Sequence, residues 1–180
     1  MEADWEMEIG GESPVIDGCW EGFVDLRSDA SRVAEISEGS QLPGLAPALN
    51  RLNGPLSDVW TSKCDVWNVE EFDPCELDAD EGSVACAMAA YIDMLPRSRR
   101  HWASPPLAER CCRQMCTALR SIQLRKCRAD FVVRRAFVTP DRPGLGITLY
   151  VTACGSSRSD ALGMLSAALP EVVEVIARSR

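Results

Sequence analysis

Three segments of the chain alternate between apolar and other side chains, and this pattern constrains the fold most. They span 83–95, 125–138 and 145–154. In the first of them Met88 and Ile92 fall on one side, and Tyr91 and Asp93 fall on the other. Because successive side chains of a strand point to opposite faces, each segment predicts a strand with one buried face. The turn residues of 139–144 predict that the last two strands form a hairpin.

Helical periodicity separates these strands. Ser104 and Pro105 provide an N-cap and a first-turn proline for a helix over 104–122. Its apolar stripe comprises Ala108, Cys112, Met115, Leu119 and Ile122. Shorter helices are predicted over 28–36 and 43–52, and a last one starts at Ser157 or Ser159 and runs to about 177, with Pro170 imposing a kink or break.

Two further strands complete the expected order. The alternation of 19–27 predicts a first strand, and 58–68 predicts another, followed by an acidic loop over 70–82. The chain then reads as an α+β fold: one mainly antiparallel sheet, with helices packed on one face, in ferredoxin-like (βαββαβ) order extended by a C-terminal strand and helix. An alternative is a pair of ββα units at 58–122 and 125–177, although their sequences show no clear repeat.

Length and charge define the expected domain. The 180 residues suit one core, which we place at 18–180, and the acidic segment 1–17 predicts a flexible tail. Residues 1–81 carry 4 Lys and Arg against 20 Asp and Glu, whereas 82–180 carry 15 against 7. Two halves of one domain that neutralise each other explain this asymmetry better than an anionic partner does.

The nine cysteines and the N-terminal composition point to a reducing compartment. An odd number of cysteines, scattered through predicted strands and helices, favours buried free thiols over a disulfide framework. Residues 1–14 lack the basic and apolar regions of a signal peptide, and no apolar run reaches membrane-spanning length. We therefore expect a cytoplasmic protein without a membrane partner. The pair Cys112 and Cys116 lacks the second cysteine pair that a zinc site needs, so no cofactor is expected.

The strand faces opposite the predicted core mix aromatic rings with both signs of charge. A plainly solvated face would carry Lys, Glu, Thr and Ser instead. Aromatic area beside arginine is typical of binding surfaces, which makes this face the predicted binding site. Its residues are Lys63, Asp65, Trp67, Tyr91, Asp93, Arg128, Asp130, Arg134 and Tyr150.

The preferred hypothesis is a non-catalytic binding or assembly module, whose partner is another protein or a second copy of the chain. Nucleic acid is disfavoured because aspartates on this face repel phosphates. A plainly structural role, in which the charges pair only with their cross-strand neighbours, stays open.

Enzyme alternatives also remain. A divalent metal would need two or more of Asp25, Asp65, Asp93 and Asp130 within reach of one point, which only strand register decides. A reactive thiol would be Cys154, which ends a strand before a helix. His101, the only histidine, is the candidate general base, although a solvated loop position is the simpler interpretation.

Overall fold

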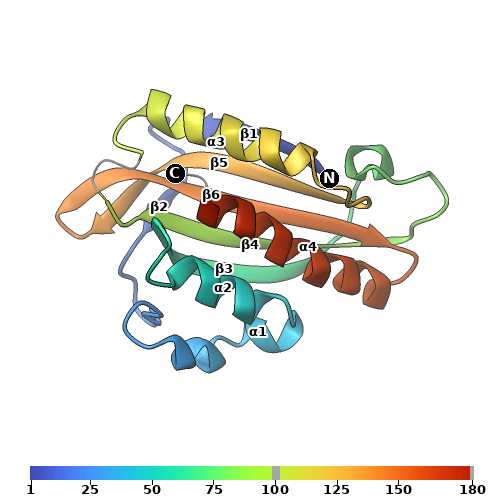
Figure 1. Ribbon diagram of the computed structural model, residues 1–180, viewed down its shortest axis with the longest axis horizontal. Coiled ribbons are helices and arrows are strands. Elements are labelled where there is room, and N and C mark those ends of the chain that lie inside the picture. The colour runs from blue at the N-terminus through green and yellow to red at the C-terminus, as the bar shows by residue number, and fades with distance from the viewer. Residues whose placement is uncertain (99–101, 179–180) are drawn as a thin grey trace.

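The computed structural model describes residues 1–98 and 102–178 as an α+β fold with one six-stranded sheet. Helices α2, α3 and α4 lie side by side on one face of this sheet (Figure 1). The strands are β1 (Glu2–Glu8), β2 (Val15–Asp17), β3 (Val59–Val69), β4 (Cys86–Pro96), β5 (Cys127–Thr139) and β6 (Arg142–Gly155). The helices are η1 (Ala30–Glu35), α1 (Glu38–Gln41), α2 (Leu45–Asn53), η2 (Pro74–Leu77), α3 (Pro105–Arg120) and α4 (Arg158–Arg178).

The sheet is mixed, which corrects the expectation of a mainly antiparallel one. Its order is β1-β5-β6-β4-β3, and the short β2 also pairs with β5. Strands β3, β4, β6 and β5 form successive antiparallel pairs, whereas β1 and β2 both run parallel to β5. The parallel pairs come from the segment in which the sequence predicts no strand.

The N-terminal segment forms part of the sheet and is not the flexible tail that its composition predicts over 1–17. Strand β1 places Ala3 in the core, with Trp5 and Met7 packed partly against it, while its acidic residues face away. The N-terminal amine donates a hydrogen bond to the carbonyl of Ile122, 2.8 Å away. This segment therefore alternates as the other strands do, but its high content of acidic residues led to the prediction of a tail.

The predicted strand over 19–27 is wrong, because this segment crosses the end of the sheet as a loop. Leu26 reaches the main core, whereas Trp20 is 37% exposed. Phe23 packs edge-on against Trp60 of β3, with ring centroids 5.7 Å apart. The apolar residues of this segment pack into two different clusters, so its sequence alternates although it is not a strand.

Because 19–27 is a loop and the strands β1 and β2 come before it, the ferredoxin-like order is not confirmed. The chain instead begins with two strands and short helices, and then continues as β3-β4-α3 and β5-β6-α4. This continuation follows the element order of the alternative with two ββα units. Strand β4 runs parallel to β5, because each is antiparallel to β6 between them, and α3 connects the two.

The main core lies between the sheet and the helices. Its strand residues are the inward sets of β4, β5 and β6, centred on the fully buried Phe131. Helix α3 contributes the predicted stripe, with Ala108, Cys112, Met115 and Leu119 all buried, which confirms that its cysteine cluster is mostly packing. Helix α2 begins where Gly44 meets α4, and a Cβ on Gly44 would overlap the carbonyl oxygen of Ser166.

Helix α4 continues through Pro170, so the chain does not break there. Its buried residues, among them Leu165, Leu169 and Val173, pack on the sheet on both sides of this proline. Among the described residues, no helix is long and apolar enough to cross a membrane.

Candidate binding face

The face of the sheet opposite the helices carries the predicted binding residues. Alternate residues of β3, β4, β5 and β6 point there, and these include all the predicted positions except Lys63, which lies where the β3–β4 register shifts between Thr61 and Cys64. Strand β1 adds Glu2, Asp4, Glu6 and Glu8, which sequence reasoning missed because it left this segment out of the sheet. We call this surface the open face.

Strand register places five of these residues in one row across the sheet. Asp4 pairs with Asp130, Asp130 with Tyr150, Tyr150 with Tyr91, and Tyr91 with Asp65. Side chains at directly paired positions have Cβ atoms roughly 5 Å apart, so each lies beside the next. The row therefore holds two adjacent tyrosines, with Asp4 and Asp130 on one side of them and Asp65 on the other.

Three rings form an aromatic cluster at the centre of the open face. The ring centroids of Trp67, Tyr91 and Tyr150 lie 6.1 to 6.3 Å apart, in tilted and edge-to-face arrangements. This is the geometry that aromatic pairs prefer. Trp67 remains 36% exposed, while burial raises the pKa of Tyr91 to about 12. The cluster offers apolar contact area whose rings hold one another in place.

A hydrogen-bonded network lies beside the aromatic cluster. The hydroxyl of the fully buried Thr148 donates to Asp93 at 2.6 Å, and Arg134 donates to Thr148 and to the hydroxyl of Tyr150 at 3.1 Å each. Arg134 also forms an ion pair with Glu8 at 2.9 Å. Burial raises the pKa of Asp93, although Thr148 and Arg134 oppose that shift. The network connects β4, β6, β5 and β1.

A second ion pair lies further along β5. Arg128 donates to both carboxylate oxygens of Asp130, at 2.8 and 2.9 Å, and approaches Asp4 at 3.9 Å. Burial raises the pKa of Asp130; Arg128 lowers it, and the nearby Asp4 and Glu6 raise it. Asp130 is thus a carboxylate in a locally acidic surrounding with one strong cationic partner.

Two small hydrophobic clusters close the ends of the open face. At one end the 18–27 loop and β2 cover a cluster that comprises Ile16, Trp60, Leu95, Ala136 and Val138. At the other end, the 70–84 loop with η2 covers a cluster that comprises Leu77, Ala79, Ala87 and Cys154. The middle of the face, between these clusters, stays uncovered by the described residues and contains the aromatic cluster and the polar network.

A hollow of about 550 Å³ opens on this surface over β1, β5 and β6. Asp4, Glu6, Arg128, Asp130 and Tyr150 are among its lining residues. It is large enough for a side chain or a short segment of a partner, and its walls are mainly polar.

The candidate metal ligands do not converge. Asp25 lies in the 18–27 loop, where it binds Arg27 at 2.7 Å, and Asp130 is held by Arg128. Asp65 and Asp93 sit on the adjacent strands β3 and β4, and Asp93 accepts from Thr148. Within 1–98 and 102–178, no group of three or more His, Cys, Asp or Glu residues is placed to hold a metal ion.

The two groups considered for catalytic chemistry are the thiol of Cys154 and the imidazole of His101. Cys154 is fully buried in the cluster under η2, and burial raises the pKa of its thiol. A buried thiol with a raised pKa is a poor nucleophile. None of the nine cysteines, all in the described part of the chain, forms a disulfide. His101 lies outside the described residues.

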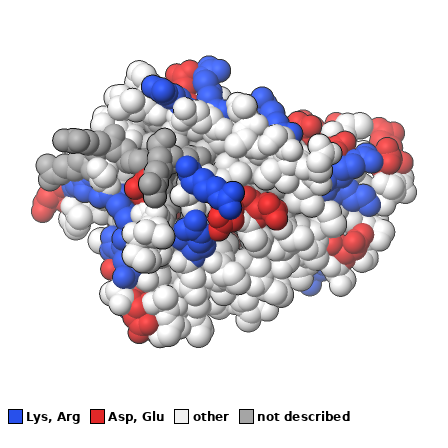
Figure 2. All heavy atoms as spheres, in the orientation of Figure 1, with Lys and Arg blue, Asp and Glu red and all other residues white. Residues whose placement is uncertain are grey.

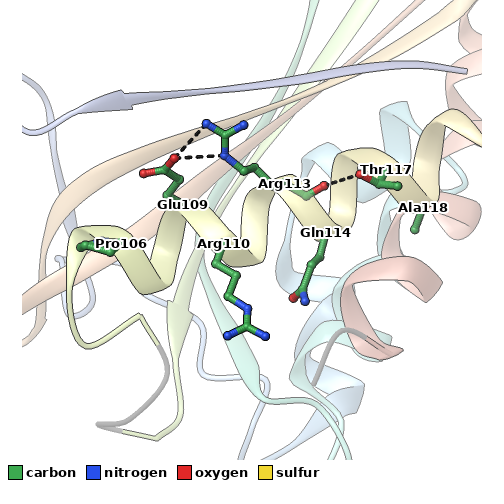
Figure 3. Close-up of a pocket in the computed structure, with 7 residues that line it drawn as sticks. All are labelled: Pro106, Glu109, Arg110, Arg113, Gln114, Thr117 and Ala118. Atoms are coloured by element: carbon green, nitrogen blue, oxygen red, sulfur yellow. Dashed lines mark hydrogen bonds and ion pairs between the residues drawn. The ribbon is translucent and has the colours of Figure 1, made fainter.

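The helical side of the molecule has a different distribution of charge. Figure 2 views that side, where basic and acidic side chains are interspersed among broad uncharged areas. A hollow of about 640 Å³ lies there, but all the residues that line it come from the outward surface of α3 (Figure 3). Glu109 and Arg113 form an ion pair along one side of this helix, and Arg110 and Gln114 project from the other. Without a wall from a second element, it is no defined site.

Comparison with protein-family models, with curated proteins and with solved structures finds no match for this chain.

Proposed function

We propose that this chain is a non-catalytic cytoplasmic binding module and that the open face is its interface with a protein partner. The observation that carries the proposal is the aromatic cluster of the exposed Trp67 and the half-buried Tyr91 and Tyr150, which lies in the middle of a sheet face whose two ends are covered. Rigid aromatic area beside arginine is where protein interfaces concentrate their binding energy.

The surrounding charges support a role in orientation. Arg134 and Arg128 are each held by a carboxylate, so their guanidinium groups keep fixed positions at the edge of the aromatic cluster. Fixed polar groups around an apolar centre give an interface its register and its specificity. Nucleic acid is a poor occupant, because carboxylates on β1, β3, β4 and β5 would repel its phosphates.

Site-resolved crosslinking in cells tests the proposal. A photo-crosslinking amino acid is placed at Trp67, on the open face, and in a separate variant at Leu107, an exposed apolar position on α3. We expect a protein that crosslinks at position 67, does not crosslink at position 107, and is lost when Tyr150→Ala is added. If both positions capture the same proteins, or position 67 captures none, the proposal is wrong.

A further inference from the structure

We propose that the partner presents a basic segment to the open face: a short stretch of polypeptide with Arg or Lys on either side of an apolar or aromatic centre. This inference rests on the proposed function and adds the chemistry of the partner. Three properties of the open face carry it: its charge balance, the order of residues in its central row, and its dimensions.

The open face is acidic. Among the face positions named above it carries two basic residues, Arg128 and Arg134, against seven acidic ones, which are Glu2, Asp4, Glu6, Glu8, Asp65, Asp93 and Asp130. Both arginines are already engaged, since Arg134 binds Glu8 and Arg128 binds Asp130, and Arg120 of α3 approaches Asp4 at 3.9 Å. The excess negative charge is therefore left for a partner to balance.

This charge balance selects among possible occupants. A second copy that used the same face would set its carboxylates against these carboxylates, and like charges brought together at an interface cost free energy. Nucleic acid meets the same repulsion. A basic polypeptide instead gains from every uncompensated carboxylate, which makes it the occupant of choice.

The central row gives the expected pattern of that segment. Asp4 and Asp130 lie on one side of Tyr150 and Tyr91, and Asp65 lies on the other. An arginine can stack on a tyrosine or tryptophan ring while it forms a bidentate ion pair with a neighbouring carboxylate. Apolar contact in the middle with a cation at each end matches this row.

The dimensions of the open face fit a short extended segment. Five strands spaced about 4.8 Å apart place the outer two roughly 19 Å apart. An extended chain of about six residues covers that distance. The two end clusters limit the face along the strands, so the segment would cross the strands and not run along them.

The protonation of the open face supports the same inference. Burial raises the pKa of Asp130, and Asp4 and Glu6 add to that shift. A bound cation would favour the ionised carboxylate and would lower this pKa. Binding should therefore release protons and weaken as the pH falls.

Selection from a library of short random peptides displayed on phage tests the inference. The bait is the full chain, compared with a Trp67→Ala/Tyr150→Ala variant and with Leu107→Ala as the matched control on α3. We expect the wild type and Leu107→Ala to enrich peptides rich in Arg and Lys that the double variant does not retain. Circular dichroism and urea unfolding check that each variant is folded.

One enriched peptide is then measured quantitatively. Asp65→Asn and Asp4→Asn, which keep the packing of the face, should each weaken the affinity for this peptide by roughly three-fold, as expected for exposed ion pairs. Added salt should weaken the affinity further.

Two results overturn the inference in distinguishable ways. Neutral or acidic peptides that bind the wild type and lose binding in the double variant would leave the open face as an interface but refute a basic partner. A selection without any peptide that depends on Trp67 and Tyr150 would refute both the basic partner and the proposed function.

Discussion

The hydroxyl of Thr148 should hold the polar network of the open face together, and its removal tests the described geometry. This hydroxyl is fully buried, donates to Asp93 at 2.6 Å and accepts from Arg134 at 3.1 Å. Thr148→Val keeps the shape of the side chain and leaves a buried carboxylate without its donor. Hydrogen bonds to charged groups contribute about 1.5–3 kcal/mol each, so we expect a loss of roughly 2–3 kcal/mol in the free energy of unfolding at neutral pH.

The pH dependence of this loss follows from the pKa of Asp93. Because burial raises that pKa, the folded state binds the proton more tightly than the unfolded state. The stability contributed by Asp93 is then fully present below the ordinary carboxyl pKa and is lost as the pH rises through the raised one. Thr148→Val raises the pKa further, so its cost should be greatest at neutral pH and smaller where Asp93 is protonated in both states.

Urea unfolding at neutral and acidic pH measures the effect. With a typical slope of about 2 kcal/mol per M, the midpoint of Thr148→Val should fall by roughly 1 M at neutral pH. Thr148→Ser, which keeps the hydroxyl, is the control and should lose less. In an Asp93→Asn background the cost of Thr148→Val should shrink, since no buried charge remains. An equal cost in both backgrounds, or at both pH values, would refute the described network.

Further predictions concern packing, the N-terminal strand and the thiols. Gly44→Ala should destabilise the fold by several kcal/mol, because its Cβ would meet the backbone of α4. Gly163→Ala, with open space around it, should stabilise the fold by about 0.5–1 kcal/mol. Thermal unfolding of the two variants measures both effects. Deletion of residues 1–17 should lower the unfolding midpoint and expose core surface, whereas a deletion without effect on urea unfolding would show that β1 and β2 do not contribute. In thiol titration of the folded protein, the exposed Cys19 and Cys75 should react first, and equal rates at all nine cysteines would contradict the described burial.

Regular local patterns explain which elements could be predicted. The three alternating segments became β4, β5 and β6, and the stripe around Cys112 and Met115 became the buried side of α3. These elements pack on one another over long stretches, so their periodicity is unambiguous. The alternation also separated the two sheet faces: the expected face residues on β3–β6, except Lys63, do lie opposite the helices.

The errors came from segments whose structure depends on distant partners. Glu2–Glu8 alternates as a strand does, but composition suggested a tail, and only pairing with β5 fixes it in the sheet. The loop over 19–27 alternates because Leu26 and Phe23 pack into two different clusters. The covering of the open face at both ends could not be predicted, since it depends on where the loops fold back.

The parallel pairing of β1 with β5 sets an order for folding during synthesis. Glu8 and Arg134, which meet in an ion pair, lie 126 positions apart, so β1 cannot dock until most of the chain has been made. At about 5–20 residues per second, the ribosome leaves this segment unpaired for roughly 6 to 25 s. Its apolar Trp5 and Met7 are exposed on the nascent chain throughout. The acidic residues that alternate with them disfavour pairing between the β1 segments of different nascent chains, and this repulsion reduces aggregation.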